Sequence, residues 1–123
     1  MRSTHPAGAV LFEQGEPGDT IYLLAHGRVS MLLERSEGLL PKRVATFAPG
    51  VTFGELAMLE ERTRTTRAHC DHDVIVWTLS SADLERITRE NPPLAASVYR
   101  ALSRMLATRL RETTRELRDV ADP

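Results

Sequence analysis

The sequence is most informative between residues 53 and 66. This stretch is Phe53-Gly54-Glu55-Leu56-Ala57-Met58-Leu59, followed by Arg62-Thr63-Arg64-Thr65-Thr66. The pattern predicts a strand end, a glycine, a short helix over about 54–59 and an arginine-bearing return segment. The first amides of a helix have no partner within it and carry partial positive charge, so they favour an anion. An arginine that returns to the same place can add a charged fork to a phosphate.

Glu55 adds a second requirement, because a carboxylate beside an anion site would repel a phosphate. A carboxylate suits a neutral hydroxyl donor such as a ribose 2′-hydroxyl, which acidic residues bind in dinucleotide sites. The segment therefore predicts a ligand in which a phosphate and a sugar hydroxyl lie close together.

Upstream and just downstream of this stretch, the sequence predicts an all-β unit. Short apolar runs alternate with turns rich in Gly, Pro and Asp at intervals of roughly 8–12 residues, the spacing of a β-sandwich or barrel. No long helix separates the runs, so a parallel Rossmann-type sheet is not expected. The predicted strands cover residues 10–12, 20–24, 28–34, 42–47, 67–70 and 74–79.

After residue 80 the periodicity becomes helical. Ser80 is a good N-cap for a helix over 81–90, and Asn91-Pro92-Pro93 should end it before a second helix over 94–119. A helix of ~26 residues spans about 39 Å, more than a small β-domain can cover. Its distal apolar stripe has heptad spacing and predicts a homodimer or partner seam, the alternative being packing on the chain's own barrel. The stripe consists of Leu106, Leu110, Thr113, Leu117 and Val120.

Composition narrows the function classes. The 123 residues carry a net charge of −1, so nucleic-acid binding is not expected. Cys70 is the one cysteine, so a reducing, cytoplasmic setting is the simplest. No apolar run approaches the ~20 residues of a membrane helix. We expect one domain over 1–123, with the β unit over about 5–80 and a hinge and helices over about 81–119.

The motifs together resemble the cyclic nucleotide-binding domain family. The quoted stretch is similar to the family's phosphate-binding cassette, and the segments Pro6-Ala7-Gly8 and Gly15-Glu16-Pro17-Gly18-Asp19 match its upstream pattern. The resemblance covers nearly the whole chain. It implies a double-stranded β-helix, a jelly-roll, cupin-like barrel, with a short phosphate-binding helix and two C-terminal helices. It also implies a non-enzymatic regulatory domain that binds cyclic AMP or cyclic GMP, without a cofactor, and relays occupancy to a fused or associated effector.

Matched by position, the resemblance assigns the ligand contacts. Gly54 and the amides of Leu56 and Ala57 would meet the cyclic phosphate, and Glu55 would bind the ribose 2′-hydroxyl. Arg64 would pair with the phosphate, although Arg62 and Arg67 are alternatives. The sequence departs from the family at Thr63, where proline is usual, and at Thr65-Thr66, where alanine or Ser-Ala is usual. The full set of expected ligand-binding residues is Phe53, Gly54, Glu55, Leu56, Ala57, Arg64, Thr65 and Thr66.

Two other interpretations remain open. A ligand-free dimeric interaction module would keep the fold and use Glu55 and Arg64 only as a structural ion pair. A cupin-like metal enzyme is disfavoured because the H-x-H ligand pair is absent. The segment His69-Cys70-Asp71-His72-Asp73 contains metal-ligand residue types, but neighbouring residues of a strand point to opposite faces, so no metal site is expected.

Overall fold

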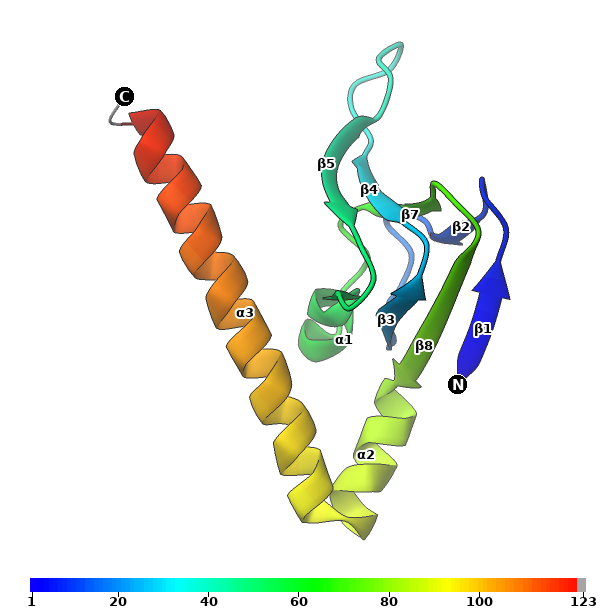
Figure 1. Ribbon diagram of the computed structural model, residues 1–123, viewed down its shortest axis with the longest axis vertical. Coiled ribbons are helices and arrows are strands. Elements are labelled where there is room, and N and C mark those ends of the chain that lie inside the picture. Colours follow the sequence, from blue (N-terminus) through cyan, green and yellow to red (C-terminus); the bar gives the residue numbers. More distant parts are fainter. Residues whose placement is uncertain (122–123) are drawn as a thin grey trace. The chain divides into compact units, whose positions relative to one another are not determined.

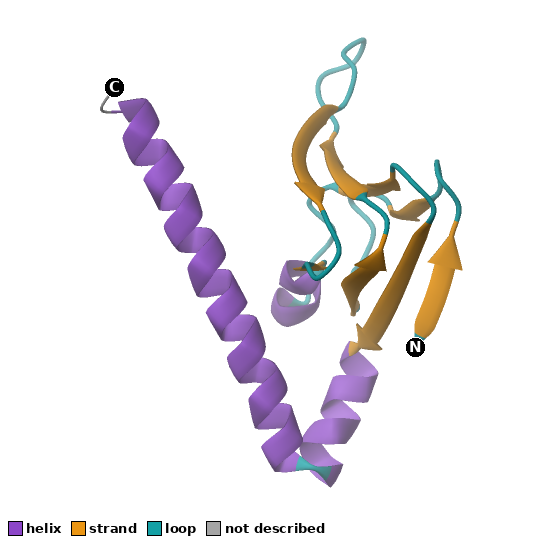
Figure 2. Ribbon diagram, viewed as in Figure 1, coloured by secondary structure: helices purple, strands orange, loops and turns teal. Residues whose placement is uncertain are grey.

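The computed structural model describes residues 1–121 and divides into two compact units, Met1–Ser81 and the segment from Ala82 onward. All strands fall in the first unit, and the two longer helices make up the second (Figure 2). The first unit contains β1 (Arg2–His5), β2 (Val10–Phe12), β3 (Thr20–His26), β4 (Val29–Leu33), β5 (Lys42–Phe47), β6 (Thr52–Phe53), α1 (Glu55–Glu60), β7 (Arg67–Cys70) and β8 (Val74–Ser80).

The eight strands form two antiparallel four-stranded sheets (Figure 1). One has the order β1-β8-β3-β6 and the other β2-β7-β4-β5, so strands distant in sequence are neighbours in both. This is the predicted jelly roll with C-terminal helices, but its strands form a sandwich of two sheets in place of a closed barrel.

β1 was not predicted, and β6 was predicted only as the strand end before Gly54. β1 has the polar sequence RSTH and gives no apolar alternation, yet it pairs with β8 from Arg2↔Trp77 to His5↔Val74. β6 has only two residues and pairs with β3. Both are held by backbone hydrogen bonds to a longer strand, which side-chain patterning does not reveal.

The core of the first unit consists of side chains that alternate inward along these strands. Cys70 is fully buried there, as a small apolar residue. The buried cluster comprises Phe12, Leu24, Val29, Met31, Phe53, Ala68, Cys70, Val74 and Val76. The apolar run of β8 predicts a core position for its tryptophan, but Trp77 is 49% exposed and alternates with buried Val76.

The second unit contains α2 (Ser81–Glu90), apart from its first residue, and α3 (Pro92–Ala121), with only Asn91 between the two helices. α2 has the predicted bounds, but α3 begins at Pro92 and not at residue 94. Proline is tolerated in the first helical turn, where its missing N–H has no partner to lose. The Asn91 side-chain oxygen accepts the amide of Leu94 at 3.3 Å, as a helix N-cap does.

Candidate functional site

α1 begins directly after Gly54, whose φ of 80° lies in the left-handed region. A side chain at this position would lie 2.7 Å from Nη1 of Arg64, so glycine is needed both for the backbone turn and for the close approach of the arginine. Glu55, the first residue of the helix, is only 3% exposed. The local sequence thus places a carboxylate and a guanidinium beside the same glycine.

Arg64 carries the positive charge of this site. Its Nη1 donates to the carbonyl oxygen of Gly54 at 2.7 Å, and its Nη2 donates to that of Thr20 at 2.9 Å. The guanidinium carbon lies 4.2 Å from the centre of the Phe12 ring, in cation–π contact. The residue is 5% exposed, and its buried Nε has no hydrogen-bond partner among the described residues.

Nearby acidic groups partly offset the effect of burial on the pKa of Arg64. Burial lowers the pKa of Arg64, and the nearby Tyr22, Asp19, Glu16 and Glu55 oppose that shift. Arginine nevertheless stays protonated in proteins. A charge taken out of water and bonded to neutral carbonyls is a favourable place for an incoming anion.

The turn before β3 packs its backbone against the arginine segment. Arg64 donates its amide to the carbonyl of Glu16 at 2.7 Å, and Gly15 donates to the carbonyl of Arg64 at 2.9 Å. Pro17 and Thr63 form an isolated antiparallel bridge. Arg64 is therefore fixed by a segment more than forty positions earlier in the chain, which the sequence reasoning did not connect to it.

The predicted site residues fall into three sets. Gly54, Glu55, Ala57 and Arg64 lie together at the start of α1, and Ala57 is buried there. Phe53 belongs to the core, where its ring stacks on that of Tyr22 at 5.2 Å. The remaining three do not join the buried group, since Leu56 and Thr65 are exposed and Thr66 is half-buried.

The sequence matches the profile of the Cyclic nucleotide-binding domain family over residues 2–91, which is most of the chain. The chain belongs to this family. The family is one of regulatory binding domains.

Named relatives of this cyclic nucleotide-binding domain are longer proteins. It is 33% identical over 117 residues to the Cyclic AMP receptor protein of Thermus thermophilus, covering 95% of this chain and 52% of that protein. The solved Catabolite Activator Protein of Thermus thermophilus superimposes with a TM-score of 0.79 at 32% identity, covering 98% of this chain and 55% of the other. Glutaminase 1 of Bradyrhizobium diazoefficiens is 32% identical over 107 residues, covering 87% of this chain and 16% of that enzyme. The domain thus spans about half or less of these relatives.

The two alternative arginines of the cyclic nucleotide-binding domain have different surroundings from Arg64. Arg67 donates to Glu13 at 2.7 Å and to Glu34 at 2.9 Å, so its fork is occupied by two carboxylates. The side chain of Arg62 is 78% exposed and lies 3.4 Å from Glu60. Of the three arginines, Arg64 is the one that contacts Gly54.

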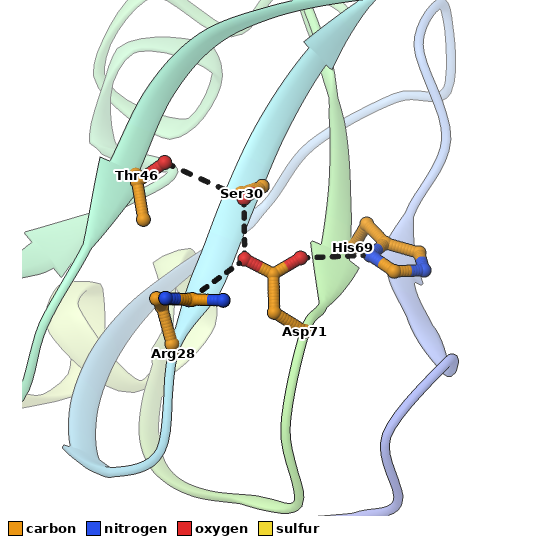
Figure 3. A network of polar contacts seen from close by, with 5 residues as sticks. All are labelled: Arg28, Ser30, Thr46, His69 and Asp71. Carbon is orange, nitrogen blue, oxygen red and sulfur yellow. Dashed lines mark hydrogen bonds and ion pairs between the residues drawn. The ribbon is translucent and has the colours of Figure 1, made fainter.

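A second polar cluster lies at the start of β4, on β5 and at the end of β7, and it includes His69 and Asp71 from the segment rich in metal-ligand residue types (Figure 3). Asp71 accepts the Ser30 hydroxyl and the Nε of Arg28 on one oxygen, and lies 3.2 Å from Nδ1 of His69 on the other. Thr46 lies 3.5 Å from Ser30. Within residues 1–121, no group of three or more His, Cys, Asp and Glu side chains is arranged to hold a metal ion. The cluster therefore links neighbouring strands through side-chain hydrogen bonds, and the Ser30 hydroxyl donates its hydrogen to Asp71.

We expect Asp71 to make the stability of the domain depend on pH. Burial raises the pKa of its carboxyl, but hydrogen bonds from Ser30 and His69, with the charges of Arg43 and Arg28, outweigh this and hold the pKa below its usual 3.8. When folding lowers the pKa of a carboxyl, the ionised group stabilises the folded protein at pH values above the unfolded-state pKa. This stabilisation is lost as the pH falls through the folded-state pKa. We expect Asp71→Asn to cost about 1–3 kcal/mol at pH 7, as charge-assisted hydrogen bonds are weakened.

Urea unfolding of wild type and Asp71→Asn at pH 7, 5, 4 and 3 measures this effect. The gap between their unfolding free energies should be constant from pH 7 to 5 and should narrow below about pH 4. A gap that stays the same at every pH would mean that the Asp71 carboxyl is not the titrating group.

No helix among residues 1–121 combines the length and apolarity needed to cross a membrane.

Proposed function

We propose that this domain is a non-enzymatic, cytoplasmic sensor that binds cyclic AMP or cyclic GMP. The observation that carries the proposal is the buried guanidinium of Arg64, with one unpartnered N–H, beside Gly54 and the buried Glu55 in a chain of this family. A buried cation and a buried carboxylate at one glycine fit a ligand that offers an anion and a hydroxyl group together.

Each residue has a distinct role in this proposal. Arg64 pairs with the cyclic phosphate, to which Gly54 and the amides of Leu56 and Ala57 also turn. Glu55 accepts the ribose 2′-hydroxyl. Phe53 supports the site from the core, and Thr65 and Thr66 lie next to Arg64 in sequence, where a hydroxyl can contact the ligand. No cofactor takes part.

Occupancy is relayed through the C-terminal helices to a fused or associated effector. The ligand must bind one arrangement of the domain more tightly than another, with a coupling of about 1–3 kcal/mol. The distal stripe of α3 supports a homodimer seam, because Leu110, Leu117 and Val120 are exposed in the single chain. Apolar side chains at heptad spacing are those that a second helix covers.

Isothermal titration of the chain with cyclic AMP and cyclic GMP tests the proposal. We expect saturable binding of one ligand per chain and a preference for one base. Binding of neither nucleotide would favour the ligand-free interaction module of the same fold.

Glu55→Gln tests the ribose contact. The 2′-hydroxyl donates to a carboxylate more strongly than to an amide oxygen, by about 1 kcal/mol, so the preference for the ribose ligand over its 2′-deoxy analogue should narrow about five-fold. Titration of both proteins with cyclic AMP and 2′-deoxy cyclic AMP measures the preference. Thermal unfolding without ligand confirms that the variant is folded. An unchanged preference would remove Glu55 from this role.

A further inference from the structure

Gly18 lies against the side chain of Arg64. A Cβ at this position would be 2.5 Å from Nε and 2.7 Å from Cζ of Arg64, and 2.6 Å from the Cβ of Ala57. Such distances are far below van der Waals contact, so any other residue at position 18 must displace its neighbours. The backbone of Gly18 is not in the left-handed region, so the requirement for glycine here comes from space and not from the turn.

The backbone holds Gly18 in this place. Gly18 donates its amide to the carbonyl of Arg62 at 3.4 Å, and neighbouring Glu16 accepts the amide of Arg64 at 2.7 Å. Two backbone hydrogen bonds thus join the turn around Gly18 to the segment Arg62–Arg64. Neither can move away from the other without loss of these bonds.

The guanidinium has defined neighbours on its other sides. Gly54 and Thr20 accept one N–H each from the two terminal nitrogens, and the Phe12 ring covers a face. A guanidinium has five N–H donors in a rigid plane, so a shift of the whole plane breaks both carbonyl bonds together. The Nε–H, next to Gly18, is the buried donor that these contacts leave unused.

We propose that Gly18 is a positioning residue for ligand binding, because its missing side chain lets the Arg64 guanidinium lie where its unused donors meet the ligand phosphate. This inference rests on the proposed function. The effect of a side chain at position 18 is steric. A methyl group there displaces the Arg64 guanidinium by roughly 1 Å, and a misplacement of that size weakens an interaction that depends on orientation by on the order of 100-fold.

Gly18→Ala tests the proposal by isothermal titration with cyclic AMP and cyclic GMP. We expect at least a ten-fold loss of affinity for the nucleotide that wild type prefers. Gly38→Ala is the control for backbone strain, since Gly38 lies in the loop between β4 and β5 and its added Cβ meets nothing within 4 Å. It has a φ of 85°, so it should lower stability while leaving affinity within about three-fold of wild type.

A double variant separates the arginine from the helix. In Gly18→Ala/Ala57→Gly, the clash with the Ala57 methyl group is relieved while the clash with Arg64 remains. Affinity relative to the Ala57→Gly single variant should stay at least ten-fold reduced. Recovery of affinity in the double variant would overturn the proposal, because the methyl of Ala57 and not Arg64 would then be the partner that matters.

A spectroscopic readout needs no ligand. The Nε–H proton of Arg64 should give a resolved, slowly exchanging NMR signal in the ligand-free wild type, because the atom is buried. Gly18→Ala should shift this signal and speed its exchange, whereas Gly38→Ala should not. An identical signal in Gly18→Ala and wild type would overturn the inference alone, as would wild-type affinity in Gly18→Ala. Absence of nucleotide binding by wild type would instead overturn the proposed function, and this inference with it.

Discussion

Arg64→Ala is expected to lower the affinity for cyclic nucleotide by roughly 30-fold to several thousand-fold. The bound phosphate would lose its charged partner, and truncating one member of a buried charge pair costs on the order of 2–5 kcal/mol. Arg64→Lys should recover only part of this loss, because an ammonium group cannot donate to Gly54, Thr20 and the ligand as a planar fork.

Isothermal titration measures the affinities, with Arg62→Ala as the matched control. Arg62 is two positions away and its side chain is largely exposed, so its loss should change affinity by less than about three-fold. Thermal unfolding without ligand shows how much of the Arg64 effect is structural, since the two carbonyls lose a donor. Equal nucleotide affinities for wild type and Arg64→Ala would assign the phosphate to another group.

The sequence predicted the parts of the fold that side-chain patterning controls. Six strands, the helix over 81–90 and the short helix after Gly54 are present close to their expected bounds. The bounds of α3 were less accurate, because Pro92 and Pro93 indicate a helix stop and are equally compatible with a helix start. Trp77 was misplaced because alternation within a strand does not identify which of its two faces is buried.

The site was predictable in composition and less so in geometry. The spacing of Gly54, Glu55 and Arg64 indicated a phosphate and a sugar hydroxyl, and the structure brings Gly54 and Arg64 into contact. The role of Phe12 and of the turn around Gly18 depends on long-range pairing between that turn and the arginine segment. The glycine-rich turn was recognised as a turn, but a local motif does not indicate which distant segment packs on it.

Gly27→Ala is expected to have the largest effect on stability, at roughly 2–5 kcal/mol. Gly27 connects β3 and β4 with a φ of 93°, which an L-residue adopts at a cost of about 1–2 kcal/mol. An added Cβ would also lie 2.8 Å from Cγ1 of Val74 and closer still to the carbonyl oxygen of Asp73. These are backbone and core atoms, so the turn before β8 must move to make room, and overpacking of this kind adds about 1–3 kcal/mol.

Gly8→Ala separates the two contributions in the Gly27→Ala result. Gly8 has a φ of 88°, nearly that of Gly27, but a Cβ there would meet nothing within 4 Å. Urea unfolding should therefore show only the backbone cost of about 1–2 kcal/mol in Gly8→Ala and the larger loss in Gly27→Ala. Because Gly27 packs on Asp73 and Val74, where the turn after β7 enters β8, the difference between the variants measures how tightly these two turns fix the sandwich. Equal losses in the two variants would mean that the turn before β8 yields at no cost and that the close contact at Gly27 does not constrain the fold.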